Sequence, residues 1–398
     1  MVSRIVGPDR EALLSVAKKF GTSVYVYSQE RIEQQCQKLK RHFPGVSFHY
    51  AVKANSNPTI LSIIRKQGIG AEAVSLGELK IVKASGFTAA RTSFTCSNLT
   101  EQELTLAAAS GARVHLDSLR QLEIWGRLKL GRDVSLRLNQ GVGAGHHAHV
   151  ITGGPHSKFG ISLVDIPEAL ALAERYQLRI TGIQQHIGSN ALDASVLLLA
   201  MRTLLKTAAS FKDIEHLDFG GGLGIPYAPD EKQLDLKTLG KEFRTYTEAF
   251  RKKQGREIVF SMEPGRFIVA EAGSLLVSVV DAKETSERRF VGVNSGFNQL
   301  IRPTMYGSYH PIDNLSRTRG KSAKITIAGN VCESGDIFAV NREMVVPEIG
   351  DTLAIRNAGA YGFSMASTYN MHALPKEILA TSAGRAKDIS FSPSTYAL

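Results

Sequence analysis

The chain has 398 residues, 43% of them hydrophobic, and this is enough for two compact domains, one of which can be a large barrel. No run of about 18 apolar residues occurs, and the N-terminal sequence MVSRIVGPDREALL lacks the apolar core of a secretory signal. We therefore expect a cytoplasmic protein that does not bind a membrane. The three cysteines are too few for a disulfide framework and lack zinc-ligand spacing, so free thiols are expected.

The balance of 48 basic against 37 acidic residues gives a formal net charge of +11. Such an excess can mark a nucleic-acid surface, but here the basic residues are dispersed. The densest clusters, Lys38–Arg41 and Arg251–Lys253, are short and carry no interleaved aromatic residues. A solvated basic surface, with no nucleic-acid partner, is the interpretation we favour.

Short strand-like runs alternate with helical patterns through the first two thirds of the chain, which is typical of βα units around a parallel sheet. Eight runs can be counted: 47–53, 69–74, 91–96, 113–117, 134–139, 180–188, 216–222 and 258–265. Helix starts are indicated by Asn57 with Pro58 and by a capping box from Ser75 to Glu78. We predict an α/β protein whose (β/α)8 TIM barrel spans residues 24–268.

After about residue 270 the helical pattern fades and alternating runs appear at 274–282, 288–294, 323–329 and 351–359. They predict a mainly β, sandwich-like second domain over residues 269–398, to which residues 1–23 also belong. In the barrel region, polar residues fall at or near the ends of most runs, namely Lys53, Glu72, Asp117, Arg137, His186 and Glu263. Because barrel active sites are built at the carboxyl ends of strands, these residues predict one polar pocket.

Several of these motifs have both a chemical and a purely structural interpretation. Lys53, in an otherwise apolar strand tip, can attack an aldehyde to form an imine or can simply extend its amine to solvent. The glycine run Gly220–Gly224 can hold a phosphate or form a plain turn, and its spacing does not fit a Rossmann motif. Glu263 can hydrogen-bond a protonated pyridine nitrogen or pair with Arg266. His186 can stack on an aromatic cofactor or be an ordinary core histidine.

Two further segments need interpretation. Cys332 is followed closely by Glu333 and Asp336, so its thiol can be a proton donor rather than an inert packed side chain. The Gly141–His156 loop contains four histidines, but no H-E-x-x-H pattern or partner carboxylate supports a zinc site. We expect no metal and interpret the loop as a mobile cover of the barrel mouth.

Read in chain order from residue 50 to residue 370, these motifs resemble diaminopimelate decarboxylase, a fold-type III, alanine-racemase-like family that uses pyridoxal 5'-phosphate (PLP). The resemblance covers nearly the whole chain. It implies that Lys53 carries PLP as a Schiff base and that His186 stacks on it, with Ser189 nearby. It further implies that the cofactor is held by the residues Gly222, Glu263, Gly265, Arg266 and Tyr361.

The resemblance also implies the substrate, meso-diaminopimelate, which would lose carbon dioxide to give lysine. Residues 300–306 resemble the substrate strand of the family, in which Arg302 and Tyr306, helped by Arg266, bind the distal carboxylate. Glu333 corresponds to the partner of the distal ammonium, and Tyr361 also reaches the substrate. Cys332 is the candidate acid for reprotonation. Cys332 and Glu333 would enter the site from a neighbouring subunit, which makes a homodimer the minimal active unit.

Two positions depart from the family pattern, since Glu72 replaces a more usual aspartate and His372 stands where arginine is common. Three alternative functions remain open from the sequence. The chain can be a decarboxylase of ornithine, arginine or a siderophore precursor, although these lack a partner for Arg302. A racemase would place a tyrosine where Cys332 stands. A non-catalytic PLP-binding or regulatory protein would usually have lost Lys53 or Cys332.

Overall fold

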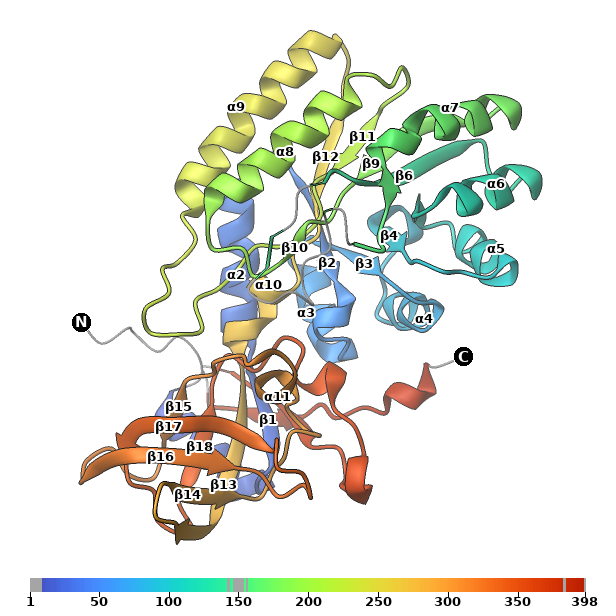
Figure 1. Cartoon of the computed structure of the whole chain (residues 1–398). Helices are drawn as coiled ribbons and strands as arrows, with labels where there is room; N and C mark the ends of the chain where they lie inside the picture. The colour runs from blue at the N-terminus through green and yellow to red at the C-terminus, as the bar shows by residue number, and fades with distance from the viewer. Residues whose placement is uncertain (1–8, 142–143, 146–153, 155–156, 382–383, 397–398) are drawn as a thin grey trace. The chain divides into compact units, whose positions relative to one another are not determined.

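The computed structural model describes residues 9–141, 144–145, 154, 157–381 and 384–396 (Figure 1). The chain divides into two compact units, which are described separately. The barrel unit comprises Gln35–Ile225, Lys232–Arg266 and Pro393–Leu398. The β unit comprises Met1–Gln34, Pro226–Glu231 and Phe267–Ser392.

Eight parallel strands close into a ring in the barrel unit, as the sequence predicts. Each strand pairs in parallel with the next, and the β2–β12 pairing closes the ring. The strands are β2 (Ser47–Ala51), β3 (Gly70–Ala73), β4 (Thr92–Thr95), β5 (Arg113–Leu116), β6 (Asp133–Asn139), β9 (Arg179–Gln184), β11 (His216–Asp218) and β12 (Val259–Met262). Three two-residue strands also occur: β8 (Ile161–Ser162), which pairs with β6, and β7 (Ala144–Gly145) with β10 (Gly188–Ser189).

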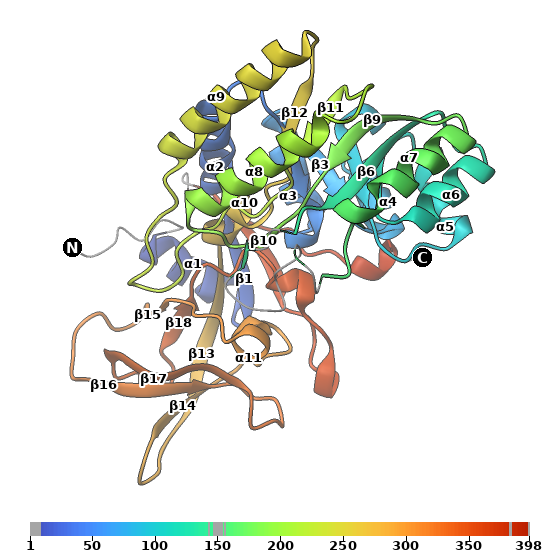
Figure 2. The same ribbon diagram turned by 45° about the horizontal axis from the view of Figure 1, so that its top comes forward.

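Helices between the strands surround the ring (Figure 2). Their apolar faces are buried, as in α6, where Leu122, Ile124 and Trp125 are all less than 9% exposed. The helices are α2 (Gln29–His42), α3 (Pro58–Lys66), α4 (Leu76–Ala84), α5 (Glu101–Ala109), α6 (Leu119–Arg127), α7 (Ile166–Arg175), α8 (Ala194–Ala208) and α9 (Leu236–Gln254).

The predicted helix starts are largely confirmed. The Asn57 side chain caps α3 by accepting a hydrogen bond from the Thr59 N–H, and Pro58 occupies the first turn. Ser75 caps α4, but the predicted capping box is wrong in its second half. The Glu78 carboxylate accepts from the Val74 N–H, one residue before the cap, at 2.8 Å. The Glu78 side chain thus reaches one residue further back than in a capping box, into the loop that follows β3.

Seven of the eight barrel strands end earlier than the predicted runs, and β6 ends at the predicted residue 139. β2 ends at Ala51, whose N–H donates to the Pro264 carbonyl, and Lys53 lies on the following 3-10 turn η1 (Val52–Ala54). Likewise His186 and Glu263 lie just beyond β9 and β12. The apolar pattern continues past the last paired residue of these strands, so the prediction from sequence extends them into the loops that follow. Lys53, Asp117, His186 and Glu263 therefore follow the carboxyl ends of their strands, whereas Glu72 and Arg137 lie within the last residues of β3 and β6.

The β unit is built on a mixed sheet in which β1 (Val24–Ser28) pairs with β13 and with β19. The predicted start of the barrel, residue 24, thus falls on a strand of the β unit. The other strands are β13 (Gly273–Glu284), β14 (Arg289–Val293), β15 (Ile312–Asn314), β16 (Ser322–Ala328), β17 (Ile337–Val345), β18 (Thr352–Ile355), β19 (Lys376–Ala380) and β20 (Ala386–Asp388). The four predicted strand runs overlap β13, β14, β16 and β18, although β18 is shorter than its predicted run at 351–359. Helix α1 (Arg10–Phe20) buries Leu13 and Val16 against this sheet.

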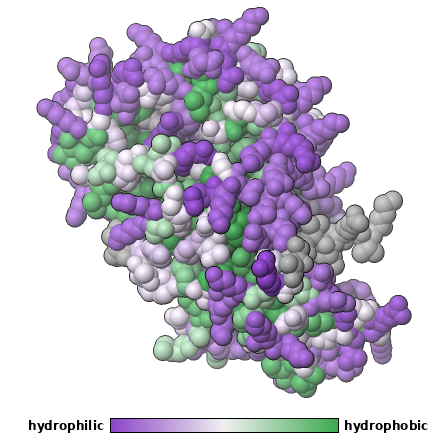
Figure 3. Space-filling model, turned by 180° about the vertical axis from the view of Figure 1, so that it is seen from behind, coloured by the Kyte–Doolittle hydropathy of each residue, from purple (hydrophilic) through white to green (hydrophobic). Residues whose placement is uncertain are grey.

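Two short helices carry residues that matter below, α10 (Arg266–Val269) and α11 (Arg302–Tyr306). Within the described ranges, no helix has both the length and the apolar character needed to cross a membrane. The face drawn in Figure 3 is covered mainly by hydrophilic side chains, with apolar ones in small groups.

Candidate active site

Lys53 lies at the carboxyl end of the barrel strands and is paired with an acid. Its Nζ donates to Oε2 of Glu72 at 2.6 Å. The Glu72 side chain is 2% exposed and that of Lys53 33%. Because a buried carboxylate without a partner is costly, this pair fixes the amine at the barrel mouth. The neighbour of Lys53 is thus an anion, whereas the sequence suggested apolar surroundings.

His186 and the glycine turn are in direct contact. The Gly221 N–H donates to Nδ1 of His186 at 3.2 Å, so this nitrogen is an acceptor. Burial, and then the positive charge of Lys53, holds the pKa of His186 well below its usual range. The imidazole is therefore neutral and carries its proton on Nε2. A neutral His186 imidazole next to the Lys53 amine can stack on a cationic aromatic ring, because the two rings do not repel each other by charge.

The glycine run brings β11 close to the loops after β9 and β12. A Cβ on Gly220 would lie 2.0 Å from the Gln185 carbonyl oxygen, and one on Gly221 would lie 2.4 Å from that of Glu263. Gly220 and Gly222 also have positive φ, +68° and +110°. Only glycine fits these positions, so the turn is specified by close approach of backbones rather than by chance composition.

Glu263 follows β12 and is 4% exposed. Its two hydrogen-bond partners are Gln184 Nε2, at 2.8 Å, and Ser93 Oγ, at 3.4 Å. The alternative ion pair with Arg266 does not form. Instead, Nε and Nη2 of Arg266 donate to Ser189 Oγ at 3.2 and 2.8 Å, and Gly265 allows the close approach of the turn to Ala51 and Ala54.

A second ion pair, between Arg137 and Asp117, lies at the ends of β6 and β5. The two charged groups are 3.3 Å apart, and the Arg137 guanidinium also lies over the Phe159 ring at 4.6 Å. All six polar residues that the sequence placed at strand ends therefore occupy the carboxyl end of the barrel. Gln184 and Ser93 were not anticipated, because inward-facing strand residues look like ordinary polar substitutions in the sequence.

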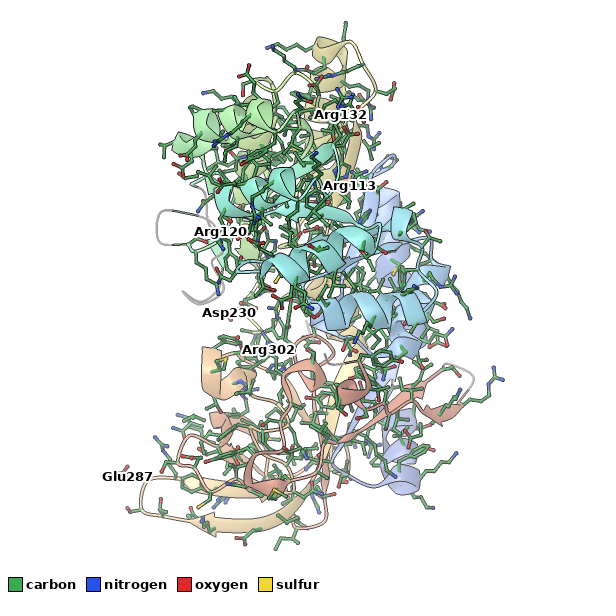
Figure 4. All side chains as sticks on the ribbon, turned by 90° about the vertical axis from the view of Figure 1, so that its right-hand side faces the viewer. Arg113, Arg120, Arg132, Asp230, Glu287 and Arg302 are labelled. Atoms are coloured by element: carbon green, nitrogen blue, oxygen red, sulfur yellow. The ribbon has the colours of Figure 1, made fainter. Side chains whose placement is uncertain are left out.

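In the β unit, residues 302–306 form helix α11, so the prediction of a strand for this segment is wrong. Pro303 has no N–H for a sheet ladder and fits the first helical turn. The Arg302 side chain, labelled in Figure 4, is buried; Nη1 donates to His310 Nε2 at 2.9 Å, and the guanidinium lies 4.6 Å from the Tyr227 ring. His310 in turn donates from Nδ1 to the Arg356 carbonyl, which fixes its tautomer.

The Cys332 segment is an exposed loop of the β unit. The Cys332 N–H donates to Oδ1 of Asn370, and the Glu333 carboxylate accepts from the Tyr369 hydroxyl at 2.7 Å. Asp336 instead turns inward and accepts from the N–H groups of Phe297 and Val331. Of the two acids, only Glu333 is therefore exposed together with the Cys332 thiol. Tyr369 and Asn370 belong to the 3-10 turn η7 (Tyr369–Met371), and His372 follows it directly.

Tyr361 has a positive φ of +56°, which is uncommon for a residue with a bulky side chain. Tyr306 ends α11 and is half-buried. The four histidines of the predicted Gly141–His156 loop, His146, His147, His149 and His156, lie outside the described residues.

Comparison with known proteins identifies the family. The family described as "Pyridoxal-dependent decarboxylase, pyridoxal binding domain" matches residues 29–270. A diaminopimelate decarboxylase of Methanothermobacter thermautotrophicus is 42% identical over 384 residues, covering 92% of this chain and 88% of the relative. The chain belongs to the diaminopimelate decarboxylase family.

Further members support this placement. The diaminopimelate decarboxylase of Escherichia coli K12 is 35% identical and covers 93% of this chain and 91% of the relative. The solved structure of the M. jannaschii diaminopimelate decarboxylase in complex with L-lysine has a TM-score of 0.86 and 33% identity, covering 95% of this chain and 91% of that one. The protein is thus a PLP-dependent carboxy-lyase, and the resemblance stated from the sequence is confirmed.

The barrel residues fit the cofactor of the diaminopimelate decarboxylase family. Lys53 offers an amine, the glycine turn offers backbone N–H groups where a side chain would clash, and His186 offers a neutral ring. Burial, and then the neighbouring Asp218 carboxylate, raises the pKa of Glu263 well above its usual range. A carboxyl group held this way in a buried site can give or share a proton with a basic ring nitrogen.

Replacing Gly221 with alanine is expected to weaken PLP binding by tenfold or more and to destabilise the protein by about 1–3 kcal/mol, the usual cost of overpacking. The new Cβ would clash with the Glu263 carbonyl and lie 3.4 Å from His186 Cε1. PLP titration by fluorescence measures the first effect. Gly292→Ala, where the nearest atom is 3.4 Å away, is the control. Equal PLP affinity in both variants would contradict the role of the turn.

Titration of the Glu78 carboxyl group is expected to make the free energy of unfolding depend on pH. Burial, and then the Glu72 carboxylate, raises the pKa of Glu78 from 4.5 to about 7. Between these values the folded state binds more protons than the unfolded state, so the free energy of unfolding falls as pH rises through this window. Glu78→Gln keeps the acceptor for Val74 and removes the charge. In urea unfolding, this variant should gain stability over the wild type at pH 8 but not at pH 4; a gain that is equal at both would contradict the assignment.

Proposed function

We propose that the protein converts meso-2,6-diaminopimelate to L-lysine and carbon dioxide, the last step of lysine biosynthesis. The observation that carries this proposal is the group formed by Lys53, His186, the glycine turn and Glu263 at one end of the barrel, in a chain of the diaminopimelate decarboxylase family. The group has the amine, the phosphate cradle and the acid that a PLP enzyme requires.

Lys53 would hold the aldehyde carbon of PLP, and the backbone of Gly222 and Gly265 would border its phosphate. Bound PLP supplies an electron sink for the pair of electrons released when carbon dioxide leaves the substrate. Lys53 would be the residue that yields its position to the substrate amine, and His186 and Glu263 would keep the ring oriented. Arg266, fixed by Ser189, would bind anionic groups at the edge of this site.

The substrate assignment rests on the residues of the β unit. Arg302 and Tyr306, with Arg266, would bind the distal carboxylate, because a guanidinium matches a carboxylate with two charge-assisted hydrogen bonds. Glu333 would bind the distal ammonium, and Tyr361 would reach both substrate and phosphate. Ornithine, arginine and lysine have no distal carboxylate, so a site that contains Arg302 favours diaminopimelate over them.

Cys332 would give a proton to the carbon that has lost carbon dioxide, because an exposed thiol next to Glu333 is placed to reach a ligand rather than a core. We infer that the active form is a homodimer in which Cys332 and Glu333 serve the partner's barrel, and that it works in the cytoplasm. Both inferences rest on the family resemblance.

The experiment is a panel in which the protein, loaded with PLP, is given meso-diaminopimelate, ornithine, arginine and lysine in turn, and carbon dioxide release is measured. We expect release from diaminopimelate alone. Arg302→Lys should raise the KM for diaminopimelate more than it lowers kcat, because lysine keeps the charge but loses the fork. Release from ornithine or arginine would instead favour the other decarboxylases, and release from none would favour a non-catalytic PLP protein.

A further inference from the structure

The interior of the barrel is polar at the level below the glycine turn. Three histidines there are each hydrogen-bonded to a serine: His49 to Ser93 at 3.2 Å, His115 to Ser135 at 2.7 Å and His216 to Ser261 at 2.8 Å. Barrel interiors are usually filled by Val, Ile and Leu. A polar interior of this kind is therefore unusual and suggests a functional role.

Two carboxylates lie together in this interior. Asp218 is fully buried, Glu263 is 4% exposed, and ligand-type atoms of both and of His115 lie within 4.8 Å of one another. The oxygens of Asp218 accept from the Gly220 N–H at 2.8 Å and from the Ser261 hydroxyl. Hydrogen bonds thus occupy the carboxylates, and we interpret the group as an acid–base cluster rather than a metal site.

The hydrogen bonds of Asp218 and Glu263 indicate which of the two acids carries the negative charge and which carries the proton. Asp218 has two donors, one of them a backbone N–H, and such donors favour the ionised form. Glu263 has the Gln184 amide and a longer bond from Ser93. The charge is therefore better stabilised on Asp218, and the proton is better placed on Glu263. In agreement, burial raises the pKa of Asp218 only to about 6 but that of Glu263 well above its usual range.

The charged and titratable groups that face the two acids are Glu72, Lys53, His49, His115, His216 and Arg113. Burial, and then the charge of Arg113, lowers the pKa of all three histidines, so they are neutral. Lys53 is already paired with Glu72. Arg113, labelled in Figure 4, lies at the other end of β5, and its charge lowers the pKa of Asp218 less than the hydrogen bonds from Ser261 and Gly220 do. A cationic ring next to Glu263 would therefore add a second positive charge to that of Arg113 in compensating Asp218.

We propose that Asp218 is a positioning residue whose negative charge keeps the ring nitrogen of bound PLP protonated, and that Glu263 supplies this proton. The O–H bond of Glu263 breaks as an N–H bond forms on the ring, so the carboxylates and the ring together carry one negative charge before and after. This inference rests on the proposed role of Glu263 and adds to it a second carboxylate behind the first.

The direct test follows the ring nitrogen itself. PLP labelled with 15N in the ring is bound to the wild type, to Asp218→Asn and to the control Asp351→Asn, in which the lost carboxylate is buried in the β unit beside Arg317. The 15N chemical shift is recorded across neutral and mildly alkaline pH. We expect Asp218→Asn to lose the ring proton at a pH lower by about 1–3 than the wild type, and the control to match the wild type. An unchanged titration in Asp218→Asn would overturn the proposal.

A second measurement needs no variant. The infrared difference between cofactor-free and PLP-bound wild type should show the loss of the C=O stretch of a protonated carboxyl group when PLP binds. Absence of this band in the cofactor-free protein would overturn the assignment of the proton. If instead Glu263→Gln leaves the 15N titration unchanged, the proposed role of Glu263 itself fails. A wild type that binds PLP but does not decarboxylate diaminopimelate would leave these spectra intact, so the failures are distinguishable.

Discussion

Replacing Lys53 with alanine is expected to abolish both turnover and the covalent attachment of PLP. The amine at position 53 is held at 2.6 Å from Glu72 at the mouth of the barrel, and alanine offers no nucleophile there. The yellow absorbance of bound cofactor should disappear. After borohydride reduction and digestion, mass spectrometry should find PLP on the Lys53 peptide of the wild type and on no peptide of the variant.

Loss of folding must be separated from loss of chemistry, because Lys53→Ala leaves the buried Glu72 carboxylate without its partner. The double variant Lys53→Ala, Glu72→Gln removes both charges and should recover stability but not activity. Lys83→Ala, an exposed lysine on α4, should behave as the wild type. Retention of turnover and colour by Lys53→Ala would contradict the assignment of this residue.

Cys332→Ala is expected to slow turnover by about 100- to 10,000-fold while PLP affinity stays unchanged, as for the loss of a general acid. The thiol lies in an exposed loop of the β unit, away in sequence from the residues that contact the proposed cofactor site. Single-turnover kinetics and PLP titration separate the two quantities.

The matched control is Cys96→Ala, which removes a half-buried thiol that follows β4 in the barrel unit. This variant should keep the wild-type rate. A rate for Cys332→Ala within a few-fold of that control would remove the acid role of Cys332 and leave the proton source to another group.

The sequence predicts the barrel and the polar end of its strands because hydrophobic period and strand-end position are local properties. It locates Lys53, Glu72, His186 and Glu263 correctly at that end. It misses Asp218, since this residue looks like part of the glycine turn until the β11–β12 register places it opposite Ser261. Register between strands and closure of the ring are long-range properties that no single run encodes.

The error at residues 300–306 has a different origin. The strand is an implication of the family resemblance and not of the local pattern. Pro303 and Gly307 are the available signals in the sequence for a helix start and a helix end, and Gly307 does adopt the αL conformation (φ +59°) that ends α11. The partner of Arg302, His310, was not foreseen because the contact depends on how the chain folds back between α11 and β15.

The central claim is tested most directly by incubating the wild-type protein with PLP and meso-diaminopimelate and quantifying lysine and carbon dioxide together. We expect equal amounts of the two, formed only when PLP is present and not by Lys53→Ala. Consumption of diaminopimelate without lysine, or no consumption by a protein that has PLP attached to Lys53, would contradict the central claim.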